Sequence, residues 1–405
     1  MIHADPIHKR GANSMKTRLW LMSFFLLSPS AIGAALLLPR IYRVDLKLDA
    51  PVIQRFLAMS MDDDGYIWIG NSTKTLFRYD PRKGAIKIIP MPISIPVGQF
   101  IASALAMNGK VYLLLEKSPV LAVYHPQSGE FTTLKLPSDK ANTWYGTTAG
   151  HSPHLYLFDR DASGLIKWDT RNDTYSIIPY PYQGPLPWAG TYVKGENALY
   201  CAIWNGNKIV RLNLATSRFD GEYPTPWKDA QPTGVVPLRD KLYVSDRLNG
   251  RLLVFNLTLH SWAQAIRIPD YGKVFGFVGA GIEYRDIAYF SLSTYKNEAG
   301  DSIDGKPYHF LDRFLAYDPR TGGFGYLQLP HQPDEYPQTA YLLAGSDGHL
   351  YFFGQDIYDP KSGVLEREYH GKATAYQTRP VASRHPVRIS MRMRSGDLGT
   401  RLSDL

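Results

Sequence analysis

The sequence predicts an all-β repeat protein, and three observations support this. Segments that begin near a tyrosine and close at a proline recur along the chain, at Tyr66, Tyr112, Tyr156, Tyr200, Tyr243, Tyr289 and Tyr351. The successive spacings of these tyrosines are 46, 44, 44, 43, 46 and 62 residues. Aromatic residues make up 13% of the chain, with 34 Gly and 29 Pro, a composition that suits many short strands and tight turns. Together they indicate an array of repeats.

Each repeat divides into four predicted strands. The first precedes the tyrosine, the second begins near it, the third leads to an Asp-Pro-x-x-Gly-like turn, and the fourth follows that turn. Between the first two strands, a glycine accepts the positive φ that a tight hairpin needs, at Asp64-Gly65, Asn108-Gly109, Lys194-Gly195 and Asp347-Gly348. Each repeat is therefore expected to form its own antiparallel sheet.

The third and fourth strands are joined by turns at Asp80 to Gly84, Asp318 to Gly322 and Asp359 to Gly363. In these turns Asp accepts from the backbone, Pro presets φ and Gly takes the left-handed position. Prolines then close the fourth strand, at Pro90, Pro137, Pro179, Pro224, Pro269 and Pro330. A proline cannot donate to a sheet ladder, so it ends an outermost strand.

Four antiparallel strands repeated about seven times predict a seven-bladed β-propeller over residues 36–370. The strand-like segment Ile41 to Leu48 is expected to pair with the last blade and close the ring. Residues 371–405 are basic and lack the repeat, so we expect a disordered tail.

Two segments carry a family resemblance. DDDGYIWIGNSTKTLFRYDPRKG, from Asp62 to Gly84, resembles the propeller repeat of two-component sensor ectodomains. VSDRLNGRLLVFN, from Val244 to Asn256, resembles the repeat of streptogramin (virginiamycin B) lyase, gluconolactonase-like and NHL-type propellers. The resemblance covers about residues 50–370. It implies the fold and no single activity, because these residues build turns and strands.

The charge is concentrated at the chain ends. The formal net charge is +8, with +3 in residues 1–35 and +5 in residues 371–405, so residues 36–370 are neutral. A neutral propeller removes the main support for a nucleic-acid partner.

The first 35 residues resemble a targeting segment. Basic residues precede an apolar run from Leu19 to Leu27 and a stretch of small residues, which predicts an export signal cleaved near Gly33 to Ala35. Leu19 to Leu38 is also long enough for an uncleaved membrane anchor. Either way the propeller is expected outside the cytoplasm, periplasmic or secreted. The single cysteine, Cys201, excludes an internal disulfide and is expected in the core.

Loops that join the fourth strand to the next first strand, and the second to the third, leave a propeller on one face. Thr294 to Arg313, a long insertion of the sixth repeat, overhangs that face. The face is expected to form an aromatic-lined ligand mouth; the alternative is that its rings pack between blades. The residues concerned are Gln99, Trp144, Tyr145, Trp188, Trp227, Phe275 and Tyr336.

Catalytic residues are harder to assign. The resemblance to streptogramin lyases implies a metal-assisted His and Glu on the channel face, and no matching His-x-Glu pair stands in this sequence. The nearest candidates are His331, Asp334 and Glu335 in one loop, with Glu283 after an inner strand. A solvated acidic loop is the favoured reading of these residues over a general acid and base.

The gluconolactonase-like resemblance implies a divalent cation, Ca²⁺ or Mg²⁺, held by carboxylate and amide oxygens. Asp246 and Asn249 lie in the segment of resemblance, although both are more simply turn residues. Glu298, Asp301 and Asp304 in the insertion form a second candidate set.

These observations favour an exported binding scaffold that presents an aromatic-rich face to a small molecule, a glycan or a protein. One alternative is a metal-dependent lyase or lactonase acting at the channel mouth, and another is a structural subunit of the cell envelope. No nucleic-acid partner is expected, and a membrane only through an uncleaved N-terminal anchor.

Overall fold

The structure is a computed structural model. It describes residues 38, 42–45, 56–71, 75–95, 101–115, 118–137, 153–158, 164–182, 184, 187, 189–272, 277–293, 310–329, 337–338, 342–356 and 373–377. All of these belong to the second of two compact units, Ala35–Leu405.

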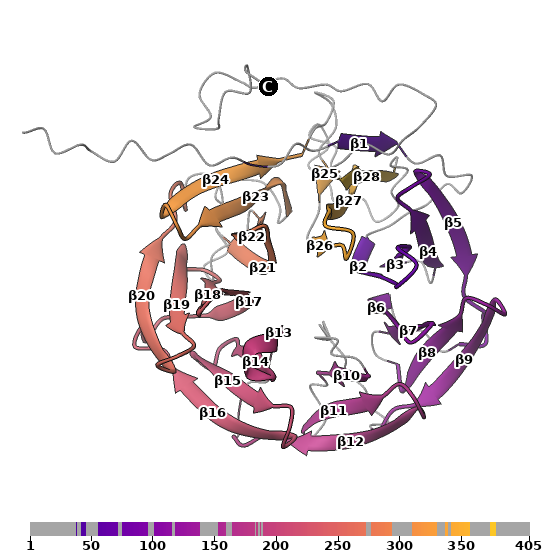
Figure 1. The fold of residues 1–405 in the computed structure, drawn as a ribbon, viewed down its shortest axis with the longest axis horizontal. Coiled ribbons are helices and arrows are strands. Elements are labelled where there is room, and N and C mark those ends of the chain that lie inside the picture. The colour runs from indigo at the N-terminus through magenta and orange to yellow at the C-terminus, as the bar shows by residue number, and fades with distance from the viewer. Residues whose placement is uncertain are drawn as a thin grey trace, which may run out of the picture. The chain divides into compact units, whose positions relative to one another are not determined.

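The described residues form a β-propeller of mostly four-stranded antiparallel blades (Figure 1). Two complete blades lie at the start of the ring: β2 (Phe56–Met61), β3 (Ile67–Asn71), β4 (Thr75–Asp80) and β5 (Ala85–Pro90), then β6 (Ile101–Met107), β7 (Lys110–Leu115), β8 (Val120–His125) and β9 (Glu130–Lys135). The third blade has three described strands, β10 (His154–Leu157), β11 (Gly164–Asp169) and β12 (Thr174–Pro179). Its predicted first strand lies outside the described residues.

Three further four-stranded blades continue the order. The fourth holds β13 (Ala189–Val193), β14 (Ala198–Ile203), β15 (Lys208–Asn213) and β16 (Arg218–Pro224), with the short 3₁₀ helix η1 (Lys194–Glu196) after β13. The fifth holds β17 (Pro232–Leu238), β18 (Lys241–Asp246), β19 (Arg251–Asn256) and β20 (Ser261–Arg267). The sixth holds β21 (Phe277–Tyr284), β22 (Ile287–Ser293), β23 (Phe310–Asp318) and β24 (Gly323–Gln328).

The last sheet departs from the repeat. Its order is β1-β28-β27-β25, and β26 also pairs with β27. The strands are β1 (Tyr42–Asp45), β25 (Pro337–Gln338), β26 (Leu343–Ala344), β27 (Leu350–Asp356) and β28 (Ala373–Gln377). We call it the mixed sheet because it combines strands from both ends of the described chain; all of its strand pairs are antiparallel. Six blades of consecutive strands are thus shown, in place of the seven regular ones that the period predicts.

The mixed sheet confirms one expectation and moves a boundary. β1, inside the predicted strand Ile41 to Leu48, pairs with β28 and so joins the last sheet. β28 begins at Ala373, beyond residue 370 where the propeller was expected to end, and pairs with β27. Hydrogen bonding to two neighbouring strands, β27 and β1, gives this segment a place in the sheet that its basic surroundings do not suggest.

Adjacent sheets pack face to face through apolar side chains. Trp68 of β3 meets Tyr124 of β8 with ring centroids 5.6 Å apart, and Phe314 of β23 meets Phe352 of β27 at 5.5 Å. Tyr351 of β27 shares a buried cluster with Tyr79 of β4. The mixed sheet therefore packs against both the sixth and the first blade. In Figure 1 the first strands β2, β6, β13, β17 and β21 lie nearest the centre.

Burial follows the position of a strand within its blade. Every residue of β14, a second strand, is buried, whereas β16, a fourth strand, alternates exposed and half-buried residues. Inner strands are covered on both faces by neighbouring blades, so they read as continuous apolar runs. Cys201 lies in β14 with none of its surface exposed, which confirms that it is a core residue.

The repeat anchor in the first blade is Trp68 and not Tyr66. Trp68 lies at the position of β3 that Tyr112 occupies in β7, and it is fully buried, whereas Tyr66 is half-buried. The indole Nε1 of Trp68 donates to Asp62 Oδ2 at 2.6 Å. The large ring needed at this position is supplied by a different residue, two positions along, so the tyrosine count misplaced the first anchor.

Most of the predicted turns that fall within the described residues are confirmed, and the turn from Asp359 to Gly363 lies outside those residues. Gly65, Gly109 and Gly348 have φ of 83°, 70° and 76° in the first turn, and Gly84 and Gly322 have 62° and 69° in the third. The prediction for Gly195 is wrong: it lies in η1, and Asn197 takes the left-handed position with φ of 47°. The extra residues between β13 and β14 fold as a helical turn instead of a two-residue hairpin.

Candidate functional site

Because the strands of a blade alternate in direction, the loops before each first strand and after each second strand leave from the same end of the sheet. We call this end the loop face. Its described part includes the β14–β15 turn at Trp204, the β16–β17 loop from Thr225 to Gln231 and the β18–β19 turn from Arg247 to Gly250.

Most of the predicted site residues lie outside the described residues, and for these the assignments remain predictions. They are Gln99, Trp144, Tyr145, Trp188, Phe275 and Tyr336 of the aromatic set, His331, Asp334 and Glu335 of the catalytic set, and Glu298, Asp301 and Asp304 of the metal set. Trp227, Glu283, Asp246 and Asn249 are described.

Trp227 packs between two blades. It is half-buried and meets Trp262 of β20 edge to face, with ring centroids 6.2 Å apart. It contacts the buried cluster shared by the fourth and fifth blades. For this one aromatic the structure agrees with the packing alternative.

Glu283 lies near the end of β21 that is opposite to the loop face. Tyr284 pairs with Ile287 beside the β21–β22 turn, and Glu283 Oε1 accepts from the Asp286 amide at 2.9 Å. The other three catalytic candidates, His331, Asp334 and Glu335, lie outside the described residues, so their relation to Glu283 stays a prediction.

Asp246 is the centre of a hydrogen-bonded network at the end of β18. Its side chain is fully buried, and Oδ1 accepts from the Gln231 amide and from Asn249 Nδ2, each at 2.8 Å. Arg251 Nε donates to Oδ2 at 2.8 Å, and Arg251 Nη2 forms an ion pair with the same oxygen at 2.6 Å. Three hydrogen bonds and an ion pair thus surround this carboxylate, and a buried charge needs such partners to be stable.

The same network extends to the loop before β17. Arg251 Nη2 also contacts Asp229 Oδ1 at 2.9 Å, and Asn249 Nδ2 donates to the Asp229 carbonyl at 2.8 Å. The hydrogen bond from Arg251 lowers the pKa of Asp229 below its ordinary value. Burial raises the pKa of Asp246, against the opposing effect of its donors.

This network does not fit the divalent cation that the resemblance implies at Asp246 and Asn249. The Asp246 carboxylate already binds a guanidinium, and the Asn249 amide presents its nitrogen to it as a donor. A cation needs both groups as oxygen donors. These two residues brace the loops around β17 and β18.

A second arrangement on the loop face joins three blades. The Arg247 guanidinium carbon lies 3.9 Å from the ring centroid of Trp204, which belongs to the fourth blade. The Arg247 amide donates to the Gln231 carbonyl at 2.9 Å, and the Arg247 carbonyl accepts from Val278 of the sixth blade at 3.1 Å. Trp204 Nε1 donates to Gln231 Oε1 at 3.3 Å. We call these three residues, Trp204, Gln231 and Arg247, the Arg–Trp cluster.

A buried hydroxyl group, that of Ser245 in β18, links inner strands of the fifth and sixth blades. Ser245 Oγ accepts from the Gly234 amide at 2.7 Å and donates to the Gly279 carbonyl at 2.9 Å, which links the fifth and sixth blades. A Cβ on Gly234 would lie 2.4 Å from the Gly279 oxygen. Only glycine allows this approach, so the backbones of β17 and β21 are close-packed at this point.

Sequence reasoning missed the Arg–Trp cluster. Trp204 and Arg247 stand in the turn sequences WNGN and RLNG, which read as ordinary connections between strands. Both residues directly follow the second strand of neighbouring repeats, and this shared position could have indicated that they lie close together.

Two features are absent from the described residues. No group of three or more His, Cys, Asp or Glu side chains is placed to hold a metal ion in that part of the chain. No described helix is both long and apolar enough to cross a membrane. The predicted leader, residues 1–35, lies outside the described residues.

Comparisons with known proteins support the fold. The sequence matches no protein-family model and no curated protein. A structure of a streptogramin B lyase is similar with a TM-score of 0.59 at 17% identity, covering 83% of this chain and 97% of the lyase. A chain of the mitotic checkpoint complex gives 0.56 at 11% identity, covering 87% and 95%, and the WD40 repeats of RRP9 give 0.57 at 9%, covering 83% and 96%. At these identities the likeness establishes a β-propeller and no activity.

Proposed function

We propose that this protein is an exported, seven-bladed propeller that acts as a binding scaffold through its loop face. The mixed sheet serves as the seventh blade, with β1 as its outermost strand, and closure by β1 ties the two ends of the propeller together. Such closure removes the need for a disulfide, which a chain with one cysteine cannot form within itself.

The observation that carries the binding proposal is the Arg–Trp cluster. A guanidinium stacked on an indole, where loops of three blades meet, concentrates positive charge beside an aromatic surface. Arg247 is only 7% exposed, and Trp204 is half-buried. A partly dry cation attracts anions more strongly than one in bulk water.

The chemistry of the cluster favours a ligand that combines a carboxylate with a flat or ring-shaped body. The carboxylate would approach the guanidinium, and the body would lie against Trp204. A sugar acid, an aromatic acid or an acidic side chain of a protein partner has this form. A small molecule, a glycan or a protein could therefore each be recognised in the same way, through a carboxylate and an adjacent flat surface.

Isothermal titration of the full chain with D-glucuronate, D-glucose and benzoate tests the proposal. Glucose is the neutral match of glucuronate, so we expect saturable binding of both acids and not of glucose. Arg247→Met should weaken acid binding at least about tenfold, the effect of losing a hydrogen bond to a charged group. Arg247→Lys keeps the positive charge and should retain part of the affinity.

The matched control is Arg239→Met. Arg239 lies in the β17–β18 turn at the opposite end of the same blade, where it contacts Asp286 at 3.5 Å. Acid binding that falls equally in the Arg239 and Arg247 variants, or no preference for acids over glucose, would contradict the proposal.

A further inference from the structure

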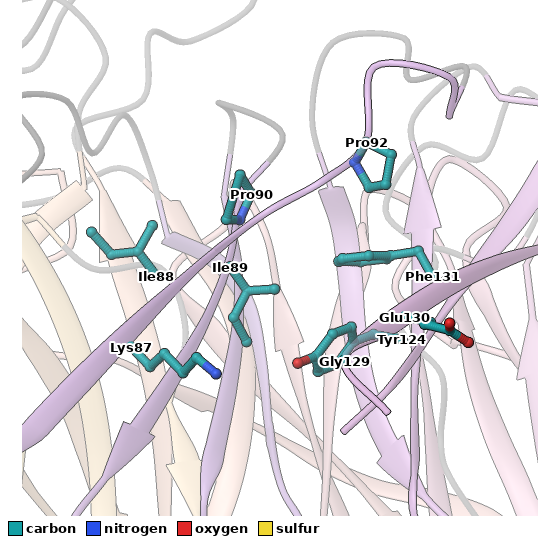
Figure 2. A pocket seen from close by; sticks show the side chains of 9 residues that line it. All are labelled: Lys87, Ile88, Ile89, Pro90, Pro92, Tyr124, Gly129, Glu130 and Phe131. Carbon is teal, nitrogen blue, oxygen red and sulfur yellow. The ribbon is translucent and has the colours of Figure 1, made fainter. Parts of the chain in front are cut away.

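A hollow of about 580 Å³ lies at the outer edge of the propeller, between the first and second blades. Figure 2 shows Ile88, Ile89 and Pro90 of β5 on one side and Tyr124 and Phe131 of the second blade on the other. We call it the edge hollow. It is distinct from the Arg–Trp cluster, because its walls are the outermost strand of the first blade and the residues flanking the β8–β9 turn.

β5 forms one wall and is the last strand of its sheet. The order of that sheet is β2-β3-β4-β5, so no described strand pairs with the outer edge of β5. Ile89 belongs to the core shared with the second blade, whereas Ile86 and Ile88 pack against the core shared with the mixed sheet. Because side chains alternate along a strand, Lys87 faces the second blade with Ile89.

Two aromatic rings form the apolar part of the other wall. Tyr124 and Phe131 contact each other with ring centroids 4.8 Å apart, and both line the hollow. Ile93, which follows the lining residue Pro92, is fully exposed at 103% of its reference surface. This exposed isoleucine adds apolar surface next in sequence to the lining of the hollow.

The charge around the edge hollow is positive. Lys87 makes no ion pair with any described residue, and in Figure 2 its amine points toward the hollow while the Glu130 carboxylate points away. In the turn that leads into β5, Arg82 and Lys83 share one carboxylate, Asp80, at 3.2 and 4.0 Å. The approach to β5 therefore favours an acidic occupant.

We propose that the edge hollow binds an extended, acidic peptide segment of a partner protein, which adds to β5 as a fifth strand. Its backbone would pair with the free edge of β5, an acidic residue would lie beside Lys87, and a large apolar residue two positions away would enter between Ile89 and Phe131. Residues two apart on a strand lie about 6.7 Å apart on the same face. Main-chain pairing supplies affinity and the alternate side chains supply specificity.

Charge also argues against a second copy of this chain as the occupant. Symmetric pairing of two β5 edges would bring the basic groups around Lys87 of both copies together, and like charges across a strand pair are unfavourable. Pairing can extend only to Pro90, which ends β5 and has no amide hydrogen to donate.

Fluorescence anisotropy with the full chain and three labelled peptides tests this inference. The probe Thr-Asp-Thr-Leu-Thr-Asp-Thr carries an acid on both sides of leucine, so it fits either strand direction; the matched peptides replace both Asp by Arg, or Leu by Ser. We expect the Asp-Leu peptide to bind about threefold to tenfold tighter than either matched peptide, a range set by exposed charge pairs and one small apolar contact.

Lys87→Glu should reverse the preference, so that the Arg peptide binds better than the Asp peptide. Lys135→Glu on β9 is the control, since Lys135 also lies on an outermost strand and does not line the hollow. Equal binding of all three peptides, or the same reversal from Lys135→Glu, would overturn the proposal.

Methylation of backbone nitrogens in the peptide tests for strand addition. Methyl groups on alternate residues remove the hydrogen bonds on one edge of the peptide only, so one of the two alternate sets should abolish binding and the other should not. Loss with both sets, or with neither, would exclude pairing with β5. Concentration-dependent dimers that Lys87→Glu stabilises and the Asp-Leu peptide does not disperse would assign the surface to a second copy and overturn the partner assignment.

Discussion

Replacing Asp246 by alanine tests whether the network around it stabilises the propeller. The carboxylate is fully buried, accepts hydrogen bonds from Gln231, Asn249 and Arg251 Nε, and forms an ion pair with Arg251 Nη2. Breaking a buried ion pair by removing one partner costs about 3 to 5 kcal/mol. Arg251 retains Asp229 and has 21% of its side chain exposed, so its guanidinium is not left isolated. We therefore expect the low end of that range, about 3 kcal/mol, in the free energy of unfolding.

Asp229→Ala is the matched control. It also contacts Arg251, at 2.9 Å, but 64% of its side chain is exposed, and exposed ion pairs are worth about 0 to 1 kcal/mol. Urea unfolding followed by far-ultraviolet circular dichroism and by tryptophan fluorescence measures both variants, and coincident transitions license a two-state free energy. If Asp246→Ala costs no more than Asp229→Ala, the burial of the carboxylate does not have the energetic weight assigned here.

Three further predictions concern single residues. Cys201 should not react with a thiol reagent in the native protein, because it is fully buried and burial raises its pKa, and it should react at once in denaturant; fast native labelling would contradict this. For Asp318, burial raises the pKa, but hydrogen bonds from the arginine two residues later lower it on balance. Its contribution to stability is therefore present above its unfolded pKa near 4 and is lost as pH falls through the lowered folded pKa. Melting from pH 7 to pH 2.5 should show a shallower acid limb for Asp318→Asn, and an unchanged limb would be evidence against this. Because Asp246 already binds a guanidinium, Asp246→Asn should leave any Ca²⁺-dependent rise in melting temperature unchanged, whereas Asp301→Asn should remove it if the insertion binds the ion. Loss of the rise in Asp246→Asn alone would restore the cation site there.

The sequence predicted the local structure, namely the strands and the turns that connect them. The period, the hairpin glycines and the Asp-Pro-x-x-Gly turns predicted strand positions, because a turn of a few residues determines its own backbone angles. The same logic failed where length changed: η1 replaced a hairpin at Gly195, and Trp68 took the place of a tyrosine. Turn chemistry locates connections, but packing between blades decides which large ring serves as an anchor.

The sequence predicted which loops share one end of the propeller, but it did not predict which of their residues form a site. Antiparallel alternation alone determines which loops share an end of the sheets. It does not determine which of their aromatics pack inward, and Trp227 does so.

The sequence by itself determined an all-β propeller of repeated antiparallel blades, since each blade is built from neighbouring segments. Only the tertiary structure decided the composition of the mixed sheet, the meeting of Arg247 with Trp204, and the hollow beside β5. The physical reason is sequence separation. Hairpin contacts form between residues a few positions apart, whereas these features join segments from different blades or from opposite ends of the chain, whose approach is set by how whole sheets pack around the ring.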